Sequence, residues 1–597
     1  AVDHLQPALQ KVPGVRTALG KLPLEPSRLV EAGVDPYLTS RDRSMFLIMV
    51  QPEDARSRVD TIAPFLARVR DTLDQAGLDK LGIRAGLTGI PQYAVDDRDI
   101  IQKDINLLSW ISFALIGALF FVAFGALRLP LMAMLTLVFA VVFTVGLVSV
   151  YPGHLTLLSA FFASVLFGLG IDYGIHLINR MEEFVRDGMT ENDALIASSA
   201  ALAPELTTGA ITTAAAFFSI VFSGFKGFAE LGVIAGVGVL VCLFMMVTLL
   251  PAMAALFPNR IGRIATGKID RLGGILLVAQ HPAWAILLGA GALACALMGR
   301  PAFNGNYMDL QPADSETARL ERKLVEKSNF SPQFAVFTFD DKAKAVDVAD
   351  RLLDEPTVAE VRSISDLEML APVEGNAAGW PAWFLRGFRS EAGRYAVYAY
   401  PKANVWEPGQ QEEFVAAMKS YDTGVTGMPV LGKFMMERSE RALVITETLG
   451  GFVVFACILL NFRRLIPALL AAMPTIMTMM GMHGIMKLLS MSYTPLNIMA
   501  LPVVLGIAVD NGVHIVQRYA AEKGDMKRTL AGSGRSVLLA TLTTLAAFGS
   551  LALTRHRGMA SFALLLTIGV AASFLLSVIV LPALLRLVPV RLLATRE

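Results

Sequence analysis

The sequence predicts an α-helical polytopic membrane protein with α/β domains on its exterior side. Hydrophobic residues make up 54% of the 597 positions and charged residues only 17%. Apolar runs repeatedly reach the length of about 20 residues that crosses a hydrocarbon core. The net charge of +1 gives no indication of a nucleic-acid partner. We expect eleven membrane helices, at 107–127, 131–151, 155–179, 205–223, 227–256, 282–298, 443–461, 465–489, 493–516, 535–553 and 559–587.

Basic residues fall on alternate connections between these helices, which the positive-inside rule assigns to the cytoplasm. Two large polar regions, 1–105 and 300–442, are then expected on the opposite side as α/β domains. Between and after them we expect membrane helices at 106–260, a cytoplasmic connector at 261–281, one helix at 282–299, further helices at 443–587 and a cytoplasmic tail at 588–597. All three cysteines lie in predicted helices, so no disulfide framework is expected to brace the exterior domains.

A repeat runs through nearly the whole chain. The pattern G-x-x-x-D-x-G-x-H occurs twice, with Asp172 and Asp510 related by a shift of 338. The same shift relates 87–91 (LTGIP) to 425–429 (VTGMP), and after the fourth-helix loop the shift becomes 331. The sequence therefore predicts two parallel six-helix repeats. The partner of helix 282–298 would precede Ala1, so we expect the first of twelve helices to be missing from this chain.

Each exterior region alternates strand-like and helix-like segments, which predicts small α/β modules with βαβ-like units. In the first region we expect strands at 44–50 and 82–87 around a helix at 59–76. In the second we expect strands at 334–339, 395–400 and 424–427 and helices at 342–353 and 410–421. An aromatic stretch, Trp380, Trp383, Phe384 and Phe388, could contact an apolar substrate, or it could be a loop packed by its own rings.

The paired aspartates carry the strongest functional signal. A carboxyl group within a membrane helix is costly and usually faces the bundle interior, where it serves an ion or proton pathway. Threonine hydroxyls on the helix that follows each aspartate could bond both its charged and its neutral form; these are Thr212, Thr213, Thr543 and Thr544. His176 and His514 lie four residues after the aspartates and could extend the relay, or could be ordinary interface residues. The alternative for the aspartates is a structural hydrogen bond without titration.

No soluble catalytic site competes with this interpretation. The sequence has no Walker A motif, no Cys or His cluster with metal-ligand spacing and no nucleophile elbow. We therefore expect no metal, no cofactor and no enzyme activity, and a proton as the coupling ion of a secondary active transporter.

With these motifs the chain resembles the resistance-nodulation-division (RND) superfamily, which has two six-helix halves, an exterior domain after the first helix of each half and G-x-x-x-D on the fourth. The single aspartate per half and the LTGIP-like segments are most similar to the MMPL lipid-transporter branch, and especially to its hopanoid-associated members. The resemblance implies antiport driven by the proton-motive force across the bacterial inner membrane, with periplasmic domains that carry lipid toward the outer membrane. It also implies proton-relay sites at Asp172 with Thr212 or Thr213, and at Asp510 with Thr543 or Thr544.

Two other functions remain open at this point. One is an RND efflux pump for drugs or other hydrophobic small molecules, and the other is a sterol-sensing or protein-translocation relative. The expected partners are a hopanoid or other lipid, protons and the bilayer itself, with a homo-oligomer (dimer or trimer) as a further possibility.

Overall fold

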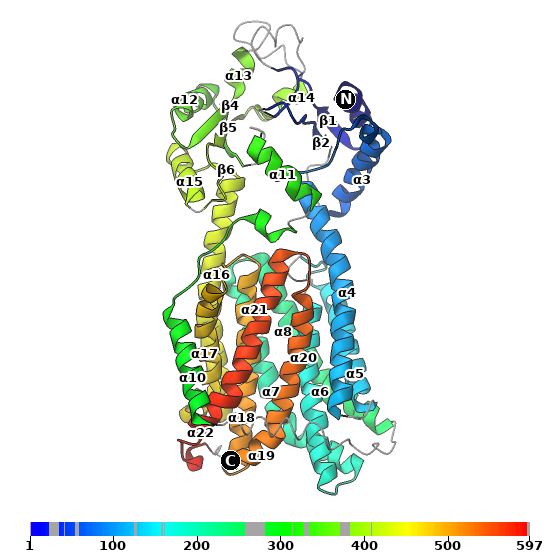
Figure 1. Ribbon diagram of the computed structural model, residues 1–597, viewed down its shortest axis with the longest axis vertical. Helices are drawn as coiled ribbons and strands as arrows, with labels where there is room; N and C mark the ends of the chain where they lie inside the picture. The colour runs from blue at the N-terminus through cyan, green and yellow to red at the C-terminus, as the bar shows by residue number, and fades with distance from the viewer. Residues whose placement is uncertain are drawn as a thin grey trace. The chain divides into compact units, whose positions relative to one another are not determined.

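The structure is a computed structural model of the 597-residue chain, and Figure 1 shows its elements. It describes residues 2–593 apart from 23–34, 41, 54–58, 125–127, 157–158, 160–161, 257–280, 313–314, 328–332, 370–381 and 408. The chain divides into two compact units. The exterior unit comprises residues 1–100 and 305–435, and the membrane unit comprises 101–304 and 436–597.

The membrane unit is a helical bundle. Ten helices of the described chain are long and apolar enough to cross a membrane, and α10 is a shorter apolar helix. This agrees with the eleven expected. The helices of the first half are α4 (Ile90–Phe124), α5 (Arg128–Val150), α6 (Phe162–Arg186), α7 (Glu191–Ser219) and α8 (Lys226–Leu256). Those that follow are α10 (Pro282–Leu297), α16 (Met428–Phe462), α17 (Leu465–Leu488), α18 (Ala500–Ala521), α19 (Met526–Thr529), α20 (Arg535–Leu551), α21 (Arg557–Leu575) and α22 (Leu581–Leu585).

Several helix bounds differ from the apolar runs. α4 and α16 begin 17 and 15 residues before the predicted starts at 107 and 443, because charged side chains in these added turns interrupt any apolar run. α7 begins at Glu191 rather than at 205. Its N-cap is Thr190, whose hydroxyl accepts a hydrogen bond from the backbone N–H of Asp193 at 3.3 Å. α6 begins at Phe162 rather than at 155.

The repeat is visible in the backbone where each half enters its first long helix. Gly89 (φ +115°) stands directly before α4, and Gly427 (φ +125°) stands directly before α16. Glycine adopts this region of φ far more readily than other residues. At Gly427 a side chain is excluded for a second reason, because an added Cβ would lie 2.2 Å from the carbonyl oxygen of Phe334. The LTGIP-like repeat is therefore an entry turn.

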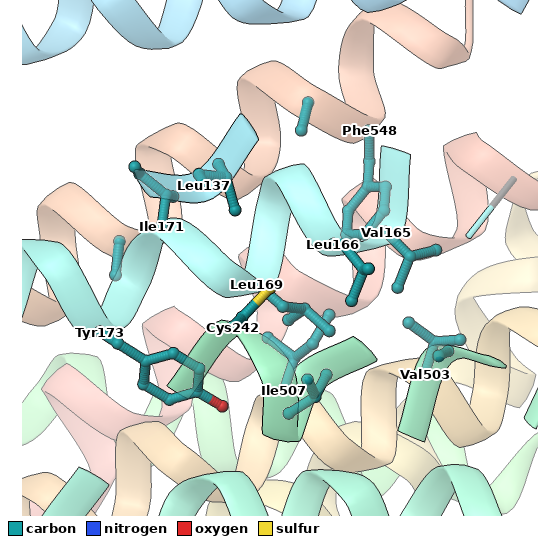
Figure 2. Packing of buried hydrophobic residues seen from close by; sticks show 14 of the residues in the cluster. Leu137, Val165, Leu166, Leu169, Ile171, Tyr173, Cys242, Val503, Ile507 and Phe548 are labelled. Carbon is teal, nitrogen blue, oxygen red and sulfur yellow. The ribbon is translucent and has the colours of Figure 1, made fainter. Parts of the chain in front are cut away.

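Two helices form the centre of the bundle. In α6 and α18, 83% and 94% of the most apolar window is buried, more than in any other candidate span of the described chain. Figure 2 shows Leu166 and Leu169 of α6 close to Val503 and Ile507 of α18, with Phe548 of α20 nearby. α7 packs against α18, and α20 packs against α6. Each half therefore places a helix against the central helix of the other.

The second part of the exterior unit contains a four-stranded antiparallel sheet of order β4-β5-β3-β6. Its strands are β3 (Ala335–Phe339), β4 (Val358–Arg362), β5 (Tyr395–Pro401) and β6 (Thr426–Gly427). Helices α12 (Lys342–Leu353) and α15 (Gln410–Tyr421) share its apolar core, which includes Phe337, Val397 and Phe414. The expected helices at 342–353 and 410–421 are confirmed. β5 lies between β3 and β4, so the expected βαβ-like unit is split by an antiparallel strand.

The first part of the exterior unit is built around α1 (Val2–Gln10), α3 (Val59–Gln75) and a two-stranded antiparallel sheet of β1 (Val15–Leu19) and β2 (Met49–Pro52). The helix expected at 59–76 is confirmed. The strand expected at 44–50 is found only at its end, because β2 covers two residues of that window, Met49 and Val50. The strand expected at 82–87 is wrong, because residues 83–88 form no regular element. The remaining elements are the helices α11 (Glu316–Lys327), α13 (Ile364–Met369) and α14 (Ala382–Leu385).

Candidate functional site: an aspartate pair between two halves

Asp172 of α6 and Asp510 of α18 face one small internal cavity at the centre of the membrane unit. Its volume is about 20 Å³, which is enough for one water molecule. His176, His514 and Tyr173 also line it. Both aspartates therefore face the bundle interior, as expected for an intramembrane carboxyl group, and they share one compartment.

Asp510 is held by the first half of the chain. Thr212 donates to its Oδ1 at 3.4 Å and Thr213 donates to its Oδ2 at 3.2 Å. Both threonines belong to α7. Gly209, one turn earlier on the same helix, makes room for the carboxylate, because a Cβ at that position would lie 3.1 Å from Oδ1. α7 is thus shaped to receive a carboxylate from α18.

Asp172 is placed in the reciprocal way, against the second half. It interacts with Thr543 of α20, while its Oδ1 is buried and has no hydrogen-bond partner among the described residues. Thr544 donates to the backbone carbonyl of Gly168 at 2.9 Å, just as Thr213 donates to the carbonyl of Gly506 at 3.1 Å. Each glycine lies four residues before its aspartate, so the crossed contact occurs twice. The two carboxyl groups differ in that Asp510 has two threonine donors.

The expected pairing of each aspartate with threonines of its own half is therefore wrong. Asp510 bonds Thr212 and Thr213, and Asp172 faces Thr543. The reason is the packing of the bundle, in which α7 lies on α18 and α20 lies on α6. All four threonines expected at the site lie there, but with exchanged partners.

The two histidines are brought together. The rings of His176 and His514 stack with centroids 4.2 Å apart and an interplanar angle of 21°. Nδ1 of His514 also contacts Oε1 of Glu205, a residue of α7 that is not among the site residues predicted from the sequence. Glu205 lies seven residues before Thr212, which places it on the same helix face two turns away. That spacing could have indicated its place in the site.

His176, Glu205 and His514 offer one ligand atom each within 4.8 Å of one another, the spacing of a loose metal site. The ring geometry does not favour an ion. Imidazole binds a metal through a nitrogen in the plane of the ring, and two nearly parallel stacked rings have no common in-plane point nearby. The contact between His514 and the Glu205 carboxylate is a hydrogen-bonded pair that suits proton transfer.

Ion pairs connect the two halves beyond the histidines. Glu183 of α6 pairs with Arg518 of α18 at 3.2 Å, and Glu182 pairs with Arg535 of α20 at 3.4 Å. Asn179 donates to Ser536 of α20 at 2.9 Å. These contacts lie at the ends of α6 and α18 that carry the basic residues, which the positive-inside rule assigns to the cytoplasm.

The exterior unit contains a largely apolar cavity of about 430 Å³, within the range of ligand pockets. Residues of both exterior segments line it: Met49, Thr88, Gly89, Glu321, Leu324, Phe334, Arg362, Gly387, Phe388, Tyr398 and Tyr400. Burial raises the pKa of Glu321 and of the Tyr398 and Tyr400 hydroxyls above their usual ranges. Burial therefore favours the neutral form of these three groups, and Arg362 is the charged group of the lining.

The aromatic stretch expected on the substrate path is only partly at this cavity. Phe388 lines it and Phe384 does not, although both rings pack against Ile364 and Leu367 with centroids 6.2 Å apart. Trp380 and the side chain of Trp383 lie outside the described residues. A further cavity of about 390 Å³ lies in the membrane unit, mainly against apolar side chains of α16, α17 and α18, with Arg300, Glu447 and His483 also in its lining.

Comparison with known proteins places this architecture in a family. The model of the MMPL family matches residues 1–271 and 407–596, well over half of the chain. The chain belongs to the MMPL family. It is 23% identical to the hopanoid transporter HpnN of Burkholderia multivorans over 87% of this chain and 71% of that protein. It is 22% identical to HpnN of Rhodopseudomonas palustris over 86% of this chain and 71% of that protein.

Another MMPL relative, the sulfolipid-1 exporter MmpL8 of Mycobacterium tuberculosis, is 26% identical over 47% of this chain and 26% of that protein. Two solved structures share the fold. The hedgehog release protein Disp of the water bear Hypsibius dujardini has a TM-score of 0.59 at 14% identity, covering 82% of this chain and 71% of that one. SecDF of Thermus thermophilus has a TM-score of 0.52 at 16% identity, and this chain spans 62% of its length. The expected RND-type architecture, a polytopic helical bundle with α/β exterior content, is confirmed.

Proposed function

We propose that this MMPL-family protein is a proton-driven lipid transporter of the bacterial inner membrane, which moves hopanoids toward the outer membrane. The observation that carries the proposal is the reciprocal pair of Asp172 and Asp510, each held by helices of the opposite half around a cavity of one water. When either aspartate gains or loses a proton, its hydrogen bonds with the other half of the chain also change. Proton binding and release would thereby move the two halves relative to each other.

Two cavities support the lipid part of the proposal. The one in the exterior unit is apolar and large enough for part of a polycyclic lipid. The one in the membrane unit is lined largely by apolar side chains of the bundle, and Ile476 and Met480 in its wall are about half exposed, on the surface that faces lipid in a membrane helix. Similarity to HpnN over most of the chain favours hopanoids over other lipids.

The test uses proteoliposomes that contain the whole protein and a hopanoid such as diplopterol, with acceptor vesicles and an imposed pH gradient. Transfer to the acceptor vesicles should depend on the gradient, and Asp172→Asn and Asp510→Asn should each reduce it by roughly 100-fold or more, since a positioned acid–base group is typically worth that much. Asparagine keeps the shape of the side chain, so both variants should remain folded and inserted. Gradient-dependent transfer by both variants at the wild-type rate would refute proton coupling through these residues.

The same assay addresses the alternative of an efflux pump. A set of hydrophobic drugs replaces the hopanoid, with the gradient and variants unchanged. Transport of several unrelated drugs together with no transfer of diplopterol would replace the lipid proposal by drug efflux. The aspartate dependence would then still test the proton part of the mechanism.

A further inference from the structure

The site departs from the two-fold repeat at one charged position. The shift of 331 that relates Thr212 to Thr543 also relates Glu205 to Ser536. Glu205 contacts His514, whereas Ser536 accepts a hydrogen bond from Asn179. The same shift relates Gly209 to Ala540, so the space that admits the Asp510 carboxylate is also specific to one half. Asp172 and Asp510 are equivalent in the repeat, but their surroundings are not.

Glu205, His514 and the cavity form one continuous chain of groups. Glu205 has 19% of its side chain exposed, and His514 has 7%. His514 lies four residues after Asp510, one helical turn away, and lines the same cavity as both aspartates. A proton on the partly exposed carboxylate can therefore reach the buried pair through a single imidazole and one water.

We propose that Glu205 and His514 form the proton port of the aspartate pair within the described part of the bundle, so that one entrance on α7 and α18 serves both carboxyl groups. The inference rests on the proposed function, since it specifies how protons reach that site. In the loading step the Glu205 carboxyl gives its proton to Nδ1 of His514. The ring then releases the proton on Nε2 to the cavity water, which protonates Asp510 or Asp172. The remaining ring proton is then on Nδ1, and a ring flip that exchanges the two nitrogens restores an acceptor toward Glu205, which recovers a proton from bulk water.

Charged and titratable groups surround His514 on the described helices that contact it. Glu205 from α7, His176 from α6 and Asp510 from its own helix face it directly. Asp172 and Tyr173 of α6 line the same cavity. The His176 ring, stacked 4.2 Å away, opposes a second positive charge next to a protonated His514. The stack therefore limits the port to one proton at a time.

The experiment follows carboxyl protonation directly, by infrared spectroscopy of the whole protein in liposomes after a pH jump. Carbonyl bands that disappear in Asp172→Asn and Asp510→Asn report the two aspartates. In Glu205→Ala the rate at which both bands respond to the pH jump should fall roughly 100-fold, because a positioned acid–base group typically accelerates proton transfer by at least that factor. A small weak acid, formic acid, fits the space vacated by the side chain and should restore the rate. Glu205→Asp should retain most of it.

Ser536→Ala is the matched control at the equivalent position of the other half, and it should leave both rates unchanged. A merely structural role for Glu205 would give a defect that formic acid does not rescue, which would overturn the proposal. Equal slowing by Ser536→Ala and Glu205→Ala would also overturn it, because the port would then be two-fold.

The infrared measurement requires no transported lipid. The proposal of the proton port and the proposal of hopanoid transport can therefore be refuted separately. Slowing and rescue in a protein that moves no diplopterol would uphold the port and remove hopanoid transport. Unaltered aspartate kinetics in Glu205→Ala, with transport still lost in Asp510→Asn, would remove the port and leave the proposed function standing.

Discussion

The hydroxyl oxygen of Thr213 in the first half lies 3.2 Å from the carboxylate of Asp510 in the second half and 3.1 Å from the carbonyl of Gly506, so the two acceptors share its one proton. One side chain therefore joins α7 both to the titratable group of α18 and to the backbone one turn before it. A change in the charge of Asp510 acts directly on the contact between the halves.

This crossed pairing can be tested without transport. Thr213→Val keeps the shape of the side chain and removes its donor, which costs about 1 kcal/mol for a typical buried hydrogen bond. We expect the infrared carbonyl band that Asp510→Asn removes to shift, while the band that Asp172→Asn removes stays in place. Pairing within each half predicts the reverse pattern, with the shift on the Asp172 band.

Two glycines of the repeated motif should differ in their tolerance of a side chain. A Cβ on Gly512 would lie 2.1 Å from the backbone carbonyl oxygen of Ala471, whereas the nearest atom to a Cβ on Gly168 would be 3.5 Å away. Gly512→Ala should therefore destabilise the protein by about 1–3 kcal/mol, the usual cost of overpacking. Gly168→Ala serves as the control and should be close to neutral. Thermal unfolding in detergent measures both, and equal melting temperatures for the two variants would contradict the close packing of α18 on α17.

The exterior cavity should require an apolar surface at Phe388. Phe388→Asp places a charge in its wall, where desolvation is unfavourable, so diplopterol transfer should fall at least about tenfold. Leu353→Asp is the control, since Leu353 is exposed on α12 of the same unit. Wild-type transfer by Phe388→Asp would move the lipid route out of this cavity, with the membrane cavity as the next candidate.

Glu321 should make the stability of the protein depend on pH. Burial raises its pKa above the ordinary value of 4.5, against a weaker opposing hydrogen bond from Tyr93. The folded state then binds more protons than the unfolded state just above pH 4.5, so this contribution to stability is present at lower pH and is lost as pH rises through the folded pKa. Glu321→Gln cannot ionise and should unfold at a higher temperature than the wild type at pH 7, with the difference vanishing near pH 4.

Glu326→Gln is the control for this measurement, because Glu326 lies on the same helix, α11, and is exposed. It removes an exposed carboxylate from the same helix and so controls for the loss of a charge on α11 without a change at Glu321. A pH-independent effect of Glu321→Gln would mean that Glu321 is not perturbed by its burial.

Much of the architecture could be predicted from the sequence because membrane helices and repeats leave local signals. Apolar runs gave the eleven helices, and the repeat identified Gly89 with Gly427 and Asp172 with Asp510. The partners of the aspartates could not be predicted in this way. A repeat shows which residues are equivalent, but whether Asp510 meets Thr544 or Thr213 depends on which half supplies the packing helix.

Glu205 and the exterior strands illustrate two other limits. Glu205 has no acidic counterpart in the repeat, because the equivalent residue is Ser536. Only its position on the same helix face as Thr212 could have indicated a role in the site. The segment 82–87 has strand-like residues, but no neighbouring strand pairs with it, and a strand requires a partner for its backbone groups. Side-chain pattern alone does not contain that information.

The reciprocal contacts of Thr213 with Gly506 and of Thr544 with Gly168 have a consequence for how such a chain could arise. A contact in which residue i of one half meets residue j of the other, and j meets i, is the arrangement of an isologous homodimer. One half alone would expose an aspartate and a threonine that do not reach each other, while two identical copies would complete both pairs at once. When the two halves are joined in one chain, equivalent positions can differ, which is impossible in a homodimer. The first half then has a carboxylate, Glu205, where the second half has a serine, Ser536.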